Sequence, residues 1–156
     1  MFRVIAFASV VTASFMAGVI FGDSALRHVP LCLTPMTVID GDTIRCEHRD
    51  IRLKGFDTPE SRAQNASCPE EIALGKIAKC TLQQMTKDGG WILTKHKGGG
   101  GYKRSLAELT IGGRNVGDTL ISLRLAQAWN VKGLKPNWCK IIEHDPGLLQ
   151  LGCTTK

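Results

Sequence analysis

The sequence predicts an α+β domain, a five-stranded OB-fold-like β-barrel with two to three helices, preceded by an N-terminal signal or anchor segment. Three observations indicate this fold. Five short segments are rich in strand-forming residues, a helical apolar pattern follows the third of them, and the chain begins with a long uncharged run. A small Greek-key barrel suits a chain of 156 residues with one core. Closure of the barrel would also remove exposed strand edges.

The N-terminal segment begins Met-Phe-Arg and continues without charge over residues 4–22. One basic residue before an apolar run is typical of a secretory signal peptide, and small residues near Ser24 would allow cleavage there. The run is also long enough to cross a bilayer, so an uncleaved anchor in the inner membrane is the alternative. We therefore expect an exported, periplasmic or secreted protein with three parts: 1–24, signal peptide or membrane anchor; 33–130, the folded domain; and 131–156, a cysteine-containing C-terminal tail.

The first three strands are expected to form a meander. They are predicted over Leu33–Ile39, Thr43–His48 and Ile51–Gly55. The first two flank Asp-Gly-Asp, a strong hairpin signal. Thr58-Pro59 ends the third.

A long helix is predicted from Pro69 to about Thr86. Proline and two glutamates are favoured in a first turn, and the glycine pair at 89–90 ends the segment. Apolar residues at helical spacing predict its buried face. They are Leu74, Ile77, Ala78, Leu82 and Met85.

Two more strands are predicted over Trp91–Lys95 and Ser105–Ile111, joined by the glycine run 98–101, which we expect to be a mobile connection. A second helix is predicted over Val116–Leu125. The tail that follows Trp129 is expected to be irregular or briefly helical.

All six cysteines follow the N-terminal segment: Cys32, Cys46, Cys68, Cys80, Cys139 and Cys153. An even number in an exported chain predicts disulfides, and 15 pairings are open. Cys68 and Cys80 should not pair with each other, because about 18 Å of helix axis would separate them. A zinc site is disfavoured because the chain has no Cys-x-x-Cys pair.

The net charge of +6 has two interpretations. A basic exported domain would be attracted to polyanions such as nucleic acid. The alternative is a basic surface that serves solubility only.

Chemistry is indicated by two turn-rich segments, Asp40–Thr43 and Arg52–Glu60. Clustered carboxylates suit a hard cation such as calcium, and a guanidinium suits a phosphate oxygen. Metal-assisted phosphodiester chemistry is therefore the first hypothesis. Strict strand alternation would place Arg52 and Asp57 on opposite faces, so the chain must twist or leave the sheet near Gly55.

Together with Tyr102-Lys103-Arg104, these segments resemble the staphylococcal nuclease-like (thermonuclease) family in order and spacing, over roughly residues 36–129. The nearest resemblance is to exported bacterial members with added cysteines, some of them named as accessory proteins of succinoglycan (exopolysaccharide) biosynthesis. The resemblance implies a calcium ion bound by the carboxylates of Asp42 and Asp57 and the backbone carbonyl of Thr58.

The resemblance also implies roles in catalysis. Glu60 would activate the attacking water, and Arg52 and Arg104 would stabilise the charge that develops on the phosphate. Tyr102 and Lys103 would contact the substrate. The chain departs from the family pattern before Arg104, where the family's acid and glycine are lost. It also departs at Arg124, where the family has a helix-ending glycine.

The expected function is thus an exported calcium-dependent nuclease that cleaves DNA and RNA, single strands being favoured, with little sequence specificity. No obligate protein partner is expected, and attachment to the membrane through the N-terminal segment is the alternative to free export. Two other functions stay open. One is an accessory protein of exopolysaccharide biosynthesis on a nuclease-like fold, and the other is a non-catalytic module that binds single-stranded nucleic acid.

Overall fold

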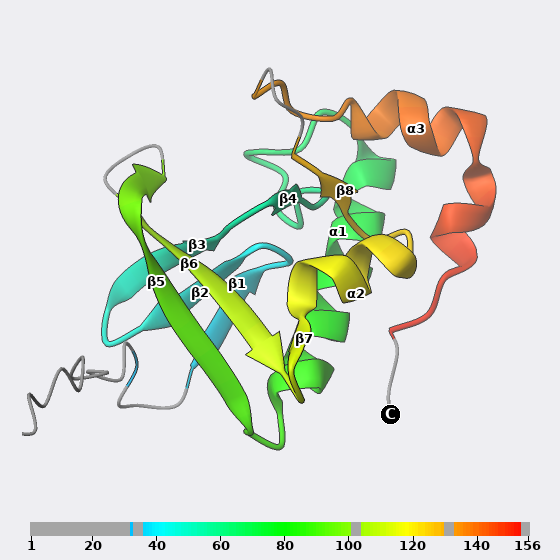
Figure 1. The fold of residues 1–156 in the computed structure, drawn as a ribbon. Helices are drawn as coiled ribbons and strands as arrows, with labels where there is room; N and C mark the ends of the chain where they lie inside the picture. The colour runs from blue at the N-terminus through cyan, green and yellow to red at the C-terminus, as the bar shows by residue number, and fades with distance from the viewer. Residues whose placement is uncertain (1–31, 33–35, 101–103, 130–132, 154–156) are drawn as a thin grey trace, which may run out of the picture.

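The structure is a computed structural model that describes residue 32 and residues 36–100, 104–129 and 133–153. The predicted signal or anchor segment, 1–24, lies outside these ranges. Within them, none of the helices combines the length and the apolar character needed to span a bilayer. The α+β class is confirmed (Figure 1).

The main sheet has the strand order β1-β2-β3-β6-β5, with β7 added to β6. The strands are β1 (Thr37–Asp40), β2 (Thr43–Cys46), β3 (Arg49–Leu53), β5 (Trp91–Gly100), β6 (Arg104–Ile111) and β7 (Arg114–Asn115). All pairs are antiparallel except β3 with β6, which is parallel. A second sheet pairs β4 (Phe56–Asp57) with β8 (Gln127–Ala128). In the described part of the chain the main sheet is open, so the predicted barrel closure is not confirmed.

Several details of the predicted strands are wrong. The described residues form eight strands where five were predicted, and the third covers Arg49–Leu53 where Ile51–Gly55 was predicted. The second strand ends at Cys46, because Glu47 and His48 take left-handed backbone conformations, with φ of 48° and 69°, and form the turn into β3. The glycine run predicted as a connection is partly strand, since Gly99 pairs with Ser105 and Gly100 with Arg104. An irregularity between His96 and Gly99 shifts the register there, which lets β5 continue into the glycines.

The long helix α1 spans Pro69–Thr86, as predicted, with Leu74, Ala78 and Leu82 fully buried. The second helix, α2 (Val116–Ser122), is shorter than predicted. It ends because Arg124 takes a left-handed conformation with φ of 62°, a position that favours glycine. The tail contains α3 (Trp138–His144) and a short 3-10 helix, η1 (Pro146–Gln150).

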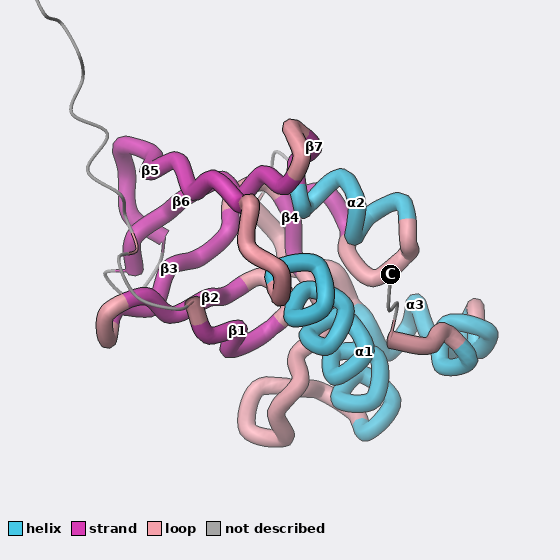
Figure 2. The backbone as a smooth tube through the Cα atoms, turned by 90° about the horizontal axis from the view of Figure 1, so that it is seen from below, coloured by secondary structure: helices cyan, strands magenta, loops and turns pink. Residues whose placement is uncertain are grey.

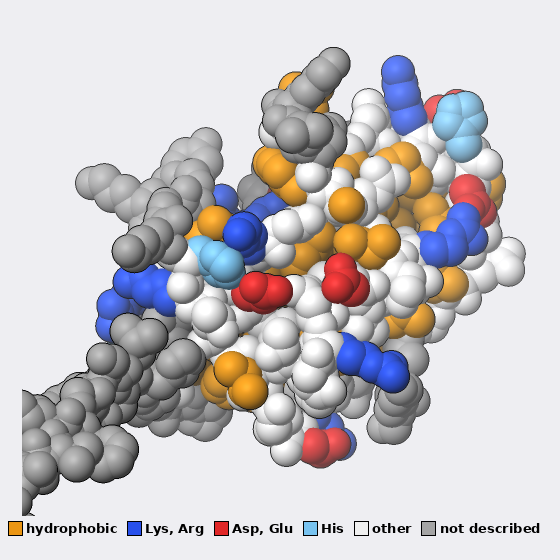
Figure 3. Space-filling model, in the orientation of Figure 1, with side chains coloured by type: hydrophobic (Ala, Val, Ile, Leu, Met, Phe, Trp, Pro, Cys, Tyr) orange, Lys and Arg blue, Asp and Glu red, His pale blue; other side chains and the backbone are white. Residues whose placement is uncertain are grey.

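The core lies between the sheet and the helices. Figure 2 shows the strands on one side and α1 beside β1 and β2, with α2 next to β7. Ile44, Leu53, Leu74, Leu109 and Leu120 are fully buried between these elements. On the face drawn in Figure 3 the apolar side chains gather over the helical half, and lysines and arginines are scattered.

Three disulfides cross-link the domain: Cys32–Cys46, Cys68–Cys139 and Cys80–Cys153. The prediction that Cys68 and Cys80 find other partners is confirmed. Both residues bind α1 to the C-terminal tail, which packs along that helix through α3 and η1. Three disulfides indicate an oxidising environment.

Candidate active site

The β1–β2 turn places two aspartates at one end of the sheet. Asp40 and Asp42 are 7% and 3% exposed. Gly41 lies between them, and a Cβ atom there would come within 2.7 Å of the Thr58 hydroxyl, so the turn packs directly on the segment after β4. Thr58 in turn donates its backbone N–H to Asp42 Oδ2 at 3.3 Å. The predicted hairpin therefore places its two aspartates against the segment that follows Asp57.

Arg52 lies between the two aspartates that the sequence predicts as metal ligands. Pairing of β2 with β3 sets Thr43 opposite Arg52, which brings the guanidinium to the turn. Its Nη2 atom is 2.8 Å from Asp42 Oδ2 and 2.6 Å from Asp57 Oδ1. One guanidinium thus bridges two buried carboxylates.

Gly55 makes this bridge possible. The backbone leaves β3 after Leu53, and Gly55 adopts φ of 95°, a conformation that a side chain would disfavour. The next two residues form β4, which pairs with β8 in the second sheet. This is the twist that strand alternation required for Arg52 and Asp57 to face each other.

Burial raises the pKa of Asp42 to about 6, against the lowering effect of Arg52 and with a further increase from the nearby charge of Asp57. The pKa of Asp40 is also raised, chiefly by burial. The Asp42 and Asp57 carboxylates, which contact the same guanidinium nitrogen, repel each other when both are ionised. The pair therefore favours a neighbouring positive charge, and the Arg52 guanidinium supplies one.

The donor set fits calcium. A carboxylate offers about four acceptor positions. Asp42 uses three, for Arg52, the Thr58 N–H and the Thr43 hydroxyl, and Asp57 uses two. Oxygen positions therefore remain on both aspartates, and calcium is flexible in its coordination geometry. A metal bound here would share these carboxylates with Arg52 or displace it from one of them.

Glu60 follows at the edge of the same site. Its backbone N–H donates to Glu71 Oε1 at 3.3 Å, and Glu71 also accepts the Ser67 N–H at 2.7 Å, so the first turn of α1 holds the loop that carries Glu60. The Glu60 side chain is 15% exposed and forms an ion pair with Lys135. Burial acts to raise the pKa of Glu60, but hydrogen bonds from Lys135 and Asn65 and the charge of Lys135 lower it below its usual value.

A cleft of about 750 Å³ opens over these groups. Asp42, Arg52, Glu60 and Arg104 all line it, so four of the predicted site residues share one cavity. Further lining residues are Asp40, Asp50, Arg62, Asn65 and Lys135. Asp57 and Thr58 lie beneath, 0% and 2% exposed. The predicted substrate contacts Tyr102 and Lys103 lie outside the described residues.

Two residues that contact the site, Lys135 and Trp138, were not predicted as members of it. Lys135 pairs with Glu60, and the buried Trp138 donates its indole N–H to Asp57 Oδ2 at 3.1 Å. Trp129, which is 41% exposed, lies against Arg52, with the guanidinium carbon 5.8 Å from the ring centre. The polar contact of Trp138 has no local sequence signal.

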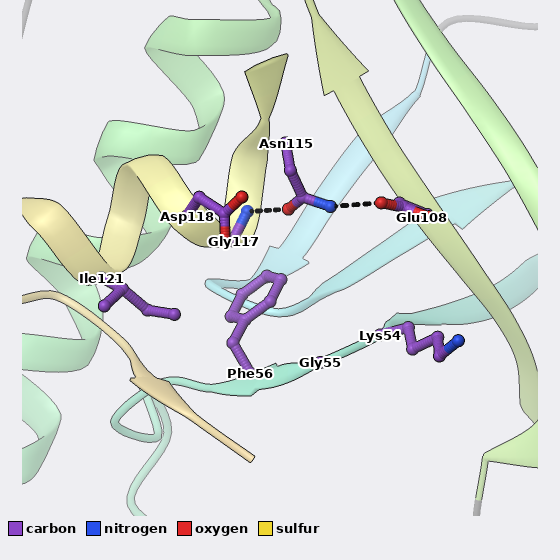
Figure 4. A pocket seen from close by; sticks show the side chains of 8 residues that line it. All are labelled: Lys54, Gly55, Phe56, Glu108, Asn115, Gly117, Asp118 and Ile121. Atoms are coloured by element: carbon purple, nitrogen blue, oxygen red, sulfur yellow. Dashed lines mark hydrogen bonds between the residues drawn. The ribbon is translucent and has the colours of Figure 1, made fainter.

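A smaller cavity of about 170 Å³ lies between residues 54–56, β6, β7 and α2 (Figure 4). Its polar groups serve the fold. Asn115 accepts the Gly117 N–H at 2.7 Å, which caps α2, and donates to Glu108 at 2.6 Å. The Phe56 ring packs so closely on Gly117 that a Cβ atom there would lie 2.3 Å from it. We assign no chemistry to this cavity.

The sulfur and carboxylate atoms of Cys68, Glu71 and Cys139 also lie close together. The two cysteines form a disulfide, so their sulfurs are not thiolate ligands. Comparison with known proteins adds no further assignment, because no protein-family model matches the chain and no curated protein is significantly similar to it.

Proposed function

We propose that the protein is a calcium-dependent nuclease of the staphylococcal nuclease type that hydrolyses phosphodiester bonds in an oxidising, extracytoplasmic compartment. The observation that carries the proposal is the bridge from Arg52 to Asp42 and Asp57 beneath a cleft that Glu60 and Arg104 also line. The residues proposed as metal ligands and general base lie there together with two arginines, and they come from three separate motifs. A single-strand nucleic-acid-binding module would not need an acid at position 60.

The residues would share the reaction as follows. Asp42 and Asp57, with the Thr58 carbonyl, would hold calcium, which supplies positive charge to a phosphate oxygen when bound. Glu60, kept ionised by Lys135, can accept a proton from water. Arg52 and Arg104 remain charged at every relevant pH and can stabilise the anionic transition state. The parallel pairing of β3 with β6 and the order of the main sheet are compatible with a partly open barrel of the OB type.

The test uses the purified protein as it is exported, with its disulfides intact. It is incubated with single-stranded DNA, with RNA and with double-stranded DNA, each in calcium or in chelator. We expect cutting that requires calcium. Glu60→Gln should lower kcat by roughly 10²-fold and leave nucleic-acid affinity nearly unchanged, because the amide keeps the shape and loses the basicity. Calcium-independent nucleic-acid binding without any cutting would favour the binding module instead.

A further inference from the structure

The C-terminal segment 133–144 reaches two of the residues on which the proposed chemistry depends. Lys135 forms an ion pair with Glu60, 75 residues away in the chain. Trp138 donates its indole N–H to Asp57, 81 residues away. No local motif requires these contacts. They arise because α3 packs along α1. Figure 1 shows α3 on the same side of the molecule as β4 and β8.

The contacts differ in their surroundings. Trp138 is 3% exposed, and Asp57 is 0% exposed, so the indole N–H and the carboxylate meet away from solvent. A buried carboxylate oxygen without a donor costs free energy, and the indole N–H satisfies this one. The Lys135 side chain is 49% exposed, whereas that of Glu60 is 15% exposed. A partly exposed ion pair adds little stability, so positioning the Glu60 carboxylate is the larger effect we expect from Lys135.

A covalent tether holds this segment at the site. Cys139 follows Trp138 directly and is bonded to Cys68, with 6.1 Å between the Cα atoms. Cys68 is the N-cap of α1, and Glu71 in the first turn of the same helix holds the Glu60 N–H. The loop that carries Glu60 and the segment that carries Lys135 are therefore both fixed to one helix turn.

We propose that residues 135–138 of this segment are a working part of the active site, in which Lys135 positions the Glu60 carboxylate and Trp138 positions that of Asp57. The proposal rests on the nuclease function proposed above. Both are positioning residues, since each acts on the reaction through an acid. Substitution of a residue that holds a metal ligand in place typically lowers activity or metal affinity by about 10- to 100-fold.

The experiment compares four variants of the oxidised full-length chain: Lys135→Met, Lys135→Arg, Trp138→Phe and, as the matched control, Lys140→Met. Lys140 is exposed on α3, five residues after Lys135, and its substitution removes the same charge from the C-terminal tail. For each variant we measure kcat and KM on single-stranded DNA with calcium, the calcium Kd by calorimetry, and Tm.

Lys135→Met should lower kcat by about tenfold with little change in KM or Tm, and Lys135→Arg should recover most of the loss. Trp138→Phe keeps the apolar packing and loses the donor, so it should change the calcium Kd by about tenfold. Lys140→Met should match wild type. Unchanged kcat in Lys135→Met, or a change confined to KM, would overturn the role of Lys135.

The result for the wild-type chain separates this inference from the proposed function. A wild-type protein that does not cut DNA or RNA in calcium contradicts the nuclease function. Calcium binding then still decides the role of the segment, because Trp138→Phe should alter the calcium Kd whether or not the protein cuts. Equal calcium affinity in Trp138→Phe and wild type would overturn the role of Trp138.

Discussion

The two halves of the candidate site are held in place by different means. The hairpin half contains Asp42, Arg52 and Asp57, and its contacts span short distances in the chain, 16 residues for Asp42 and Thr58. Strand pairing and the left-handed Gly55 position it. The C-terminal half contains Lys135 and Trp138, which contact residues 75 and 81 positions away. A disulfide and the packing of α3 position that half.

This difference has a consequence for sensitivity. Substitution in the hairpin half removes a charge from the centre of the site, whereas substitution in the C-terminal half alters how the acids are held. We expect loss of activity from the first and graded effects from the second.

Asp42→Asn should lower calcium-dependent cutting by on the order of 10³-fold, because it removes one of two carboxylates that would bind the metal. The fold should remain, since Arg52 keeps its partner Asp57 and the repulsion between the two aspartates is lost. Initial rates on single-stranded DNA and Tm measure the two effects. Asp118→Asn, at an exposed acid in the first turn of α2, is the control for the rate and should leave it unchanged. Equal rates in wild type and Asp42→Asn would remove calcium from the mechanism.

The disulfides should separate stability from activity. In the chain-entropy model, Cys68–Cys139 closes a loop long enough to contribute about 4 kcal/mol to the free energy of unfolding, and the shorter loop of Cys32–Cys46 about 3 kcal/mol. Replacing both cysteines of either pair by serine should therefore destabilise the protein to a similar degree. Only loss of Cys68–Cys139 should lower kcat under conditions where the protein stays folded. Urea unfolding and kcat are the measurements, and equal kcat losses for the two double variants would contradict the contrast.

Arg52→Lys should lower kcat by about 10²-fold and affect KM less, because an ammonium keeps the charge and loses the planar set of donors that a guanidinium presents to a phosphate. Arg104→Lys should cost less, since the bridge between Asp42 and Asp57 is made by Arg52. Steady-state kinetics on a defined oligonucleotide measure both. A loss confined to substrate affinity would mean that the arginines attract substrate and do not stabilise the transition state.

Calcium affinity should weaken by as much as tenfold per pH unit below about pH 6, because burial raises the pKa of Asp42 to about 6 and calcium binds the ionised form. In the absence of calcium, the titration of Asp42 affects stability in the opposite direction. Between about pH 4 and 6 the folded protein holds a proton on Asp42 that the unfolded chain releases, so this group's contribution to the free energy of unfolding falls as pH rises.

Calorimetry of calcium binding and urea unfolding across this pH range measure these effects. The difference between wild type and Asp42→Asn isolates the contribution of this aspartate from those of the other acids. A difference that grows in favour of wild type from pH 4 to 6 in chelator would contradict the assignment.

Local signals were sufficient for much of the fold. The bounds of α1 follow from Pro69 and its neighbouring glutamates at one end and the glycines at the other. The hairpin turn and the need for a twist at Gly55 also follow from residues near one another. The extension of β5 into glycines could not be predicted, because those residues have no intrinsic preference for strand and are held there by pairing with β6.

The C-terminal contacts could not be predicted either, since they depend on which cysteines pair. Helix geometry excludes one pairing and leaves the others open. Pairing of Cys139 with Cys68, had it been known, would have placed Lys135 and Trp138 near the loop that precedes α1. The information needed was thus a single long-range constraint.

Gly75 shows how far the demands of the site extend into the scaffold. A Cβ atom at this position on α1 would lie 2.5 Å from the carbonyl carbon and oxygen of Glu60 and 2.7 Å from the carbonyl oxygen of Pro59. Helix and site backbone are in direct contact, and neither can yield without moving the other. In a survey of all single substitutions, position 75 should therefore be as intolerant as an active-site residue, although its residue carries no side chain and touches no substrate.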